Sequence, residues 1–460
     1  MRPPVRLSSI AQFVALAVAC HQPPSTAPES PAPRAVAPLS PARSSDPTAP
    51  GAEPNATAQR PAAAPEPREQ NGNGARDDPG PSVAPSAGHF ELVGRHWGSL
   101  TRICDLQPFG SALYAAHGTK PLGWDGASIT RYAPDEKPAF TLAFDWNRPG
   151  EPTKGGAAGQ GFLRLRSFHD RLFTPDADPP YLGLGMRSGI EGYVFVSDRN
   201  GRFARSRQPG HRPPLPATTE RAGVALVPEA YHLFDVIEYQ GRVYASTSVR
   251  GPGGSAPAAL MLSSDGLDFD WGPSFPAEPG QAAWRFTYMV RFQDALLTGV
   301  EVLGGRGPDY VRWHKQPTEE VLTPAHATPM FLTRTGGLAT LRWYAHKNRL
   351  YWITAGSNGT ELYRSDDGVS WQTQALPESA GAPLDLVEFG NTLVLLTQWG
   401  LWTLPETGDS ERLADIGQPS PFALSDHYCA APLAVFRGEL YAGGQRRGEL
   451  YRFVPDASSG

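Results

Sequence analysis

The chain has 460 residues, with 49 Gly, 48 Pro, five Met and 19% charged residues. So many turn-forming residues argue against a helical protein and are typical of many short strands joined by turns. The formal net charge of −5 gives no electrostatic case for a nucleic-acid partner, and no apolar run is long enough to span a bilayer. The three cysteines are too few and too dispersed for a zinc site, so neither a metal nor another cofactor is expected.

Residues 1–20 have the layout of a signal peptide. Arg2 and Arg6 precede an apolar run, Ile10 to Ala19, that ends in small residues directly before Cys20. The ending LAVAC resembles the lipobox of bacterial lipoproteins. That resemblance implies a lipidated Cys20 at the mature N-terminus, a membrane partner for this anchor, and a place in the bacterial cell envelope, at the outer membrane or cell surface. The alternative is an ordinary secretory peptide cleaved near Ala19.

Residues 21–88 predict a disordered Pro/Ala-rich linker. Pro, Ala, Ser and Thr dominate this segment, and it has almost no aromatic or branched aliphatic residues. Such a composition cannot bury enough apolar surface to offset the entropy of ordering. Its prolines favour an extended chain, so the segment would act as a spacer that holds a domain away from the membrane.

From residue 89 to 460 one pattern recurs: an aromatic ring, a short polar or Gly turn, and a strand that opens with Leu-Tyr or a similar pair. The rings that anchor the seven copies are Phe109, Phe168, Tyr239, Phe292, His346, Phe389 and Phe436. Spacings of 43 to 71 residues fit blades of four strands with variable loops. We therefore predict an all-β fold, a seven-bladed β-propeller of four-stranded antiparallel blades.

A propeller must close, and the last repeat lacks an outer strand. Its strands are predicted at 432–436, 440–443 and 449–454, after which the chain ends. The segment 90–97, which precedes the first repeat, has the pattern of the missing strand. We predict that it closes the seventh blade, which ties the two ends of the domain together and leaves no open edge.

The fifth repeat shows the pattern of one blade most clearly. Strands are predicted at 350–354, 361–364 and 369–372, with an acidic turn at 365–368 before the third. Similar turns occupy 197–203 and 263–269. In each, Asp can bind turn amides, Gly can take a positive φ, and the aromatic residue can pack beneath the turn.

These acidic turns resemble the Asp-box of the sialidase-like, or BNR, propellers. The resemblance implies that they close the hairpin between the two outer strands, far from any active site, and that their residues are structural. The residues concerned are Ser263, Asp265, Gly266, Ser365, Asp367, Gly368 and Trp371.

Cys104 and Cys429 lie five and seven residues before the anchors Phe109 and Phe436. Both positions are predicted on one face of the inner strands, in blades that become neighbours only when the ring closes. In an oxidising envelope they can form a disulfide. The alternative is a pair of small buried thiols.

Aligning the repeats on their anchors separates two columns. The position three residues earlier is apolar in every repeat, as expected between blades. The position four residues earlier is mostly polar, and alternation predicts that these side chains line the central channel. They are Asp105, Arg164, Asp235, Tyr288, Arg342 and Asp385. They suit a binding or catalytic site for a sugar or an anion, but we favour a self-neutralising ion-pair ring around solvent.

Loops before the inner strands place a second group at the channel mouth. Its composition suits sugar stacking and anion contact, although such loops also carry ordinary polar residues. The rim candidates are Arg102, His232, Arg285, His427 and Tyr428.

The alternative function is a sialidase-like glycoside hydrolase or lyase that acts on an extracellular polysaccharide. Such enzymes use an arginine cluster, a Tyr-Glu nucleophile pair and an Asp acid. Arginines of the ring and rim, with Tyr288 or Tyr428, could supply part of this set, but no residue takes the role of the partnering Glu. Catalytic residues therefore stay unassigned. The main prediction is an exported, non-catalytic module that binds a protein or glycan.

Overall fold

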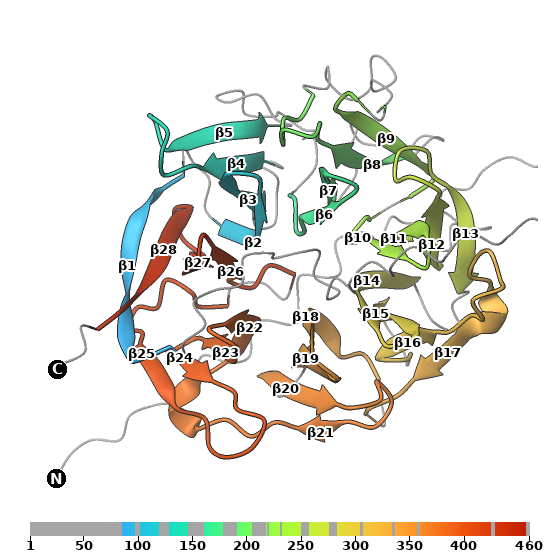
Figure 1. The fold of residues 1–460 in the computed structure, drawn as a ribbon. Helices are drawn as coiled ribbons and strands as arrows, with labels where there is room; N and C mark the ends of the chain where they lie inside the picture. Colours follow the sequence, from blue (N-terminus) through green and yellow to red (C-terminus); the bar gives the residue numbers. More distant parts are fainter. Residues whose placement is uncertain are drawn as a thin grey trace, which may run out of the picture. The chain divides into compact units, whose positions relative to one another are not determined.

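The described part of the chain forms a closed ring of seven blades, each a four-stranded antiparallel sheet (Figure 1). This computed structural model describes residues 85–96, 102–118, 128–145, 161–177, 191–204, 218, 220–230, 232–249, 257–275, 283–303, 307–333, 336–356, 359–424 and 428–456. All of them lie in the compact unit Pro67–Gly460. The predicted signal peptide, the lipidation candidate Cys20 and nearly all of the predicted linker lie outside the described residues, as does the rim candidate His427.

Blades 1 to 4 follow one another along the chain. Their strands are β2 (Arg102–Phe109), β3 (Ala112–Gly118), β4 (Ser128–Tyr132) and β5 (Phe140–Asp145); β6 (Arg166–Phe168), β7 (Arg171–Pro175), β8 (Glu191–Val196) and β9 (Gly223–Pro228); β10 (Asp235–Tyr239), β11 (Arg242–Ser248), β12 (Ala258–Ser263) and β13 (Asp270–Phe275); and β14 (Ala283–Phe292), β15 (Ala295–Leu303), β16 (Tyr310–Trp313) and β17 (Ala327–Met330).

Blades 5 to 7 complete the ring. Their strands are β18 (Ala339–His346), β19 (Arg349–Gly356), β20 (Gly359–Ser365) and β21 (Gln372–Thr373); β22 (Pro383–Phe389), β23 (Thr392–Thr397), β24 (Gly400–Thr403) and β25 (Arg412–Asp415); and β26 (Leu433–Phe436), β27 (Glu439–Gly443), β28 (Glu449–Pro455) and β1 (Gly88–Arg95). The described helices include two single turns, η2 (Pro324–His326) and η3 (Glu378–Ala380). Among the described residues no helix is long and apolar enough to cross a membrane.

The first strand of each blade lies nearest the centre of the ring, and the later strands follow outward (Figure 1). Two-residue turns join the first strand to the second. Both central residues have positive φ at His169 and Asp170 (49° and 55°) and again at Arg437 and Gly438 (52° and 75°). This is the turn whose twist matches antiparallel strands, and it explains the polar or Gly pair that follows each anchor in the sequence. We call the face that carries these turns the hairpin face.

The apolar column lies between the blades, as predicted. Leu106, Val236, Met289 and Trp343 are each at most 1% exposed. Between blades 4 and 5 the contact is aromatic, since the ring centroid of Tyr310 in blade 4 lies 5.8 Å from that of Trp343 and 5.3 Å from that of Trp352 in blade 5. Burial of these side chains between blades is the main source of stability for the ring.

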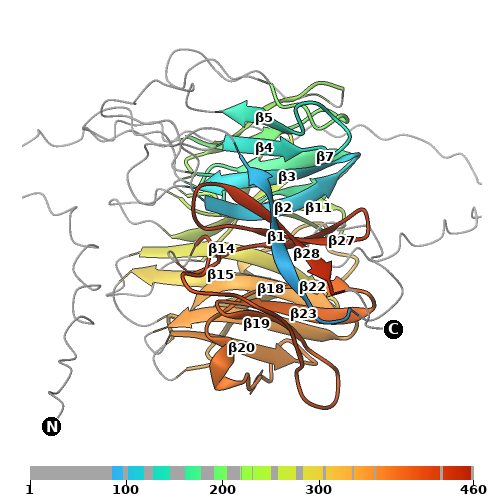
Figure 2. The same ribbon diagram turned by 90° about the vertical axis from the view of Figure 1, so that its left-hand side faces the viewer.

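The N-terminal strand closes the ring, as predicted. β1 pairs with β28 from Gly88 opposite Pro455 to Arg95 opposite Glu449, and Figure 2 shows the two strands side by side. The strand begins and ends two residues earlier than the sequence indicated. Closure leaves the seventh blade without an open outer edge at β28.

One predicted strand was wrong. The sequence indicated a strand at 369–372, but β21 begins only at Gln372. The Asp367 carboxylate accepts hydrogen bonds from the amides of Val369 (2.8 Å) and Ser370 (2.7 Å). These amides therefore form their hydrogen bonds within the turn and cannot also bond to a neighbouring strand.

Candidate functional site

The polar column predicted for the central channel is almost completely buried. Asp235 and Tyr288 are 0% exposed and Arg342 and Asp385 are 1% exposed. Asp105 and Arg164 are each 2% exposed. The ring that we expected to surround solvent is therefore shielded from solvent by the residues packed around it. What each charged side chain can do depends on the groups with which it pairs.

Each acid of the ring reaches the next blade. Asp105 accepts a hydrogen bond from the backbone amide of Leu165 (2.8 Å), and Asp235 accepts one from Met289 (2.9 Å). Asp385 accepts one from Leu433 (2.7 Å). The three donors occupy the same apolar column of blades 2, 4 and 7. The carboxylates therefore pair inner-strand amides across three blade boundaries.

Local backbone geometry places two of these acids. The β2–β3 ladder has a bulge between Ile103 and Asp105, and the β22–β23 ladder has one between Pro383 and Asp385. An extra residue in an inner strand bends it and redirects the side chain that follows. The bulge therefore comes directly before the carboxylate that crosses to the neighbouring blade.

The strongest pair in the ring includes a residue that the sequence analysis missed. Arg166 donates to Asp235 through Nε (2.8 Å) and through Nη2 (2.6 Å), and its Nη2 also donates to the Met289 carbonyl (2.9 Å). Both side chains of the pair are at most 2% exposed. Arg166 lies two residues before its anchor, on the same face as Arg164 by alternation. The alignment position two residues before each anchor would therefore have identified Arg166, had it been inspected as well.

The other two arginines flank Tyr288. The guanidinium carbons of Arg164 and Arg342 lie 5.4 and 5.9 Å from the centre of its ring. Arg164 is 3.6 Å from Asp105, and Arg342 is 3.6 Å from Asp385. Three arginines thus face three aspartates in the ring, so its formal charges balance.

Tyr288 is held as a neutral phenol. Burial raises its pKa far above the ordinary value, and the positive charges of Arg342 and Arg164 only partly oppose this. Its hydroxyl donates to the backbone oxygen of Tyr428. A buried, protonated phenol with its hydrogen committed to a carbonyl is poorly placed to act as a nucleophile.

The rim candidates that the structure describes do not form one exposed set. Arg285 pairs with Glu301 at 3.4 Å, and His232 Nδ1 lies 3.3 Å from the Ala177 carbonyl oxygen. Arg102 is only 7% exposed. Tyr428 packs toward the centre, with its ring 5.3 Å from that of Phe234.

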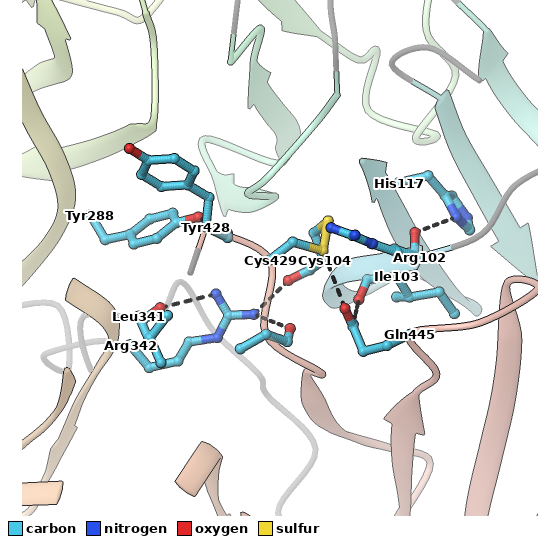
Figure 3. Close-up of a disulfide and its surroundings, with 11 residues drawn as sticks. Arg102, Ile103, Cys104, His117, Tyr288, Leu341, Arg342, Tyr428, Cys429 and Gln445 are labelled. Atoms are coloured by element: carbon cyan, nitrogen blue, oxygen red, sulfur yellow. Dashed lines mark hydrogen bonds between the residues drawn. A yellow bond between two sulfur atoms is a disulfide. The ribbon is translucent and has the colours of Figure 1, made fainter. Parts of the chain in front are cut away.

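Cys104 and Cys429 form a disulfide across the closure between blades 1 and 7. Cys429 lies before β26 and not on the inner strand, where the sequence had placed it. Figure 3 shows Arg342 and Gln445 beside the bridge. Arg342 donates hydrogen bonds to the carbonyls of Cys104 and Ala430. The boundary between blades 1 and 7 is therefore held both by the disulfide and by hydrogen bonds from a charged side chain.

The acidic turns are held by their own side chains. Gly266 donates to Ser263 Oγ (2.9 Å) and Leu267 to Asp265 Oδ1 (2.9 Å). In the fifth blade Gly368 donates to Ser365 Oγ (2.8 Å). Trp371 extends to the fourth blade, where its Nε1 donates to the Tyr310 hydroxyl (2.8 Å).

No cluster of three or more His, Cys, Asp or Glu side chains suited to a metal ion occurs in the described part of the chain.

No protein-family model matches the sequence, and no curated protein matches it. Solved structures with a similar fold include an extracellular domain assigned to a one-component system of B. thetaiotaomicron, at 10% identity and a TM-score of 0.49 over 82% of this chain and 42% of that one. Virginiamycin B lyase from Staphylococcus aureus matches at 9% identity and 0.46, over 79% of this chain and 98% of the lyase. The polysaccharide lyase Uly1 matches at 11% and 0.43, over 79% and 91%.

This chain therefore spans less than half the length of the first of these proteins. At such identities and scores the likenesses carry no argument about activity. The class of protein follows from the strand pairings of the chain itself: it is a seven-bladed β-propeller with four-stranded antiparallel blades.

Proposed function

We propose that this protein is an exported, lipid-anchored β-propeller that serves as a non-catalytic binding module for a protein or glycan in the bacterial cell envelope. The lipobox-like ending at Cys20 supports the anchor, and the Pro/Ala-rich linker supports a domain held away from the membrane. The acidic turns support a propeller of the sialidase-like, Asp-box kind.

The observation that carries the binding role is the burial of the central ring. Its aspartates accept hydrogen bonds from the inner strands of neighbouring blades, and its charges pair with one another. The ring therefore works as a set of contacts between blades. A partner would therefore contact the loops and turns on the two faces of the propeller, because binding residues commonly lie on loops that a rigid scaffold positions.

Two measurements test the proposal. The purified chain is applied to a glycan array and used to capture partners from envelope extracts, and every sugar that binds is then assayed for cleavage. We expect specific, saturable binding without turnover. Turnover of a bound sugar would instead identify a hydrolase or lyase, and no specific partner in either experiment would contradict the binding role.

The anchor is tested separately by growing cells with a clickable fatty acid. We expect the wild-type protein to be labelled and the Cys20→Ser protein to remain unlabelled. Equal labelling of the two would contradict lipidation at Cys20.

A further inference from the structure

A groove of about 550 Å³ lies between blades 1 and 2 on the hairpin face. One wall is the turn between β2 and β3, at Gly110 and Ser111, and the facing wall is the acidic turn of blade 2, from Arg199 to Phe203. Arg131 and Glu136 of blade 1 line its side. A volume of this size is typical of sites for small ligands.

We propose that this groove binds an acidic oligosaccharide through carboxylate groups. The inference rests on the proposed function, because it gives the binding module a site and a class of ligand. It concerns a different part of the molecule from the central ring and the channel rim.

The charge of the groove is the first argument. Three guanidinium groups line it, those of Arg131, Arg199 and Arg202, against the single carboxylate of Glu136. Glu136 is already engaged by Arg131 through two hydrogen bonds. Arg199 and Arg202 are exposed, and within the described part of the chain neither forms an ion pair. Apart from Asp198, whose carboxylate is engaged by amides of the same turn, the described residues around the groove thus offer these two positive charges no further acid, although the whole chain is negative.

The sequence around this turn has the same bias. Residues 199–212 contain five arginines and no Asp or Glu. Arg205, Arg207 and Arg212 lie outside the described residues, so only Arg199 and Arg202 of this run are assigned to the groove.

The wall that carries the two arginines is pre-formed. Asp198 Oδ1 accepts hydrogen bonds from the amides of Asn200 (2.8 Å) and Arg202 (2.9 Å). Gly201 has a φ of 72°, and a Cβ added there would lie 2.2 Å from the Tyr114 hydroxyl oxygen. The turn is therefore seated on the first blade before any ligand arrives, which lowers the entropic cost of binding.

The remaining lining favours a sugar. Guanidinium groups bind carboxylates in a two-point geometry. The lining also includes uncharged hydrogen-bonding side chains, from Ser111, Thr141 and Asn200, and the aromatic rings of Phe109, Tyr114 and Phe203. Such a lining suits a ligand with many hydroxyl groups and apolar ring faces. A sugar that carries carboxylates combines both features. An acidic peptide shares only the charge, and we treat it as an outcome of the test.

The test measures binding of oligogalacturonate, oligomannuronate and hyaluronan oligosaccharides to the full-length protein by isothermal titration calorimetry. Methyl-esterified oligogalacturonate, which keeps the sugar and lacks the charge, is the matched ligand. Poly-L-glutamate is the peptide probe. We expect at least one carboxylated sugar to bind, and its affinity to fall as the salt concentration rises.

The variant Arg199→Gln/Arg202→Gln removes both exposed charges of this wall and is expected to weaken that binding by roughly tenfold or more. The matched control Arg446→Gln/Arg447→Gln removes two exposed arginines from the turn between β27 and β28, on the opposite face. It is expected to change the affinity by less than about twofold, because charges so distant are screened. Thermal unfolding of both variants checks that the fold is retained.

Three results would overturn the inference. Equal binding by the groove variant and the wild type would place the sugar elsewhere and leave the binding module intact. Preference for poly-L-glutamate, or equal affinity for the methyl ester, would refute an acidic sugar as the ligand. Failure of all three carboxylated sugars would refute the ligand class, whereas the array and capture experiments decide separately whether the protein is a binding module.

Discussion

Asp235 in β10 holds Arg166 in β6 by two hydrogen bonds, of 2.8 and 2.6 Å, across the boundary between blades 2 and 3. The same carboxylate also accepts the amide of Met289 in blade 4 (2.9 Å). One buried side chain therefore connects three consecutive blades. This arrangement suggests that the polar ring of the propeller acts chiefly on stability.

The first prediction concerns this pair. In Asp235→Asn the charge of Arg166 stays buried without its partner. We therefore expect the free energy of unfolding to fall by about 3–5 kcal/mol. Asp105→Asn is the matched comparison, because Asp105 is 3.6 Å from Arg164 and lacks a two-point geometry with it. We expect Asp105→Asn to lower the free energy of unfolding by less than Asp235→Asn does. Denaturant titration measures this free energy for both variants. A larger loss for Asp105→Asn would refute this ranking.

The second prediction concerns the disulfide. Cys104 and Cys429 are 325 residues apart in the sequence, so their bridge closes a very long loop in the unfolded chain. We expect Cys104→Ala/Cys429→Ala to lower the free energy of unfolding by about 2–5 kcal/mol. Thiol labelling of the unfolded, non-reduced protein should find neither cysteine free. Two labelled thiols at these positions would show that the bridge is absent.

The third prediction concerns ring closure. Phe90 of β1 packs against Phe422 and Phe453, with ring centroids 5.2 and 5.9 Å away. Phe90→Ala should lower the free energy of unfolding by about 2 kcal/mol, from lost apolar burial. Leu92→Ala, in the same strand but 49% exposed, is the control and should change it by less than about 0.5 kcal/mol. Equal effects would mean that the packing of Phe90 does not hold β1 in place.

The fourth prediction concerns the acidic turn of blade 5. Hydrogen bonds from the amides of Ser370 and Val369 and from Ser365 lower the pKa of Asp367 well below its ordinary value. Because the pKa is lower in the folded state, the carboxylate stabilises the fold above the unfolded pKa of about 4 and loses this effect as the pH falls. We expect the Tm difference between wild type and Asp367→Asn to be largest at neutral pH and to shrink below about pH 4.

Asp366→Asn is the control for that measurement. Asp366 lies in the same turn but is an exposed acid that pairs with Arg349 at 2.7 Å. Surface pairs of this kind contribute little, so its Tm difference should be small at every pH. A Tm difference for Asp367→Asn that does not vary with pH would refute the role given to its carboxylate.

Much of the architecture was already determined by the sequence. The polar or Gly pair after each anchor encodes a tight hairpin, and the apolar residue three positions before it marks the surface between blades. Both signals depend on neighbours within a few residues. Counting these units gave seven blades, and the missing outer strand of the last repeat predicted closure by β1.

The role of the central ring was decided only by tertiary structure. Alternation placed Asp235 toward the centre, but its contact with Arg166 joins residues 69 positions apart, and its contact with Met289 spans 54. Such contacts depend on how two blades meet and on the bulges that redirect inner-strand side chains. The groove between Arg131 and Arg199 likewise exists only because two blades are adjacent. Local patterns specify each blade, whereas the surfaces and charges shared by two blades are fixed only when the blades pack together.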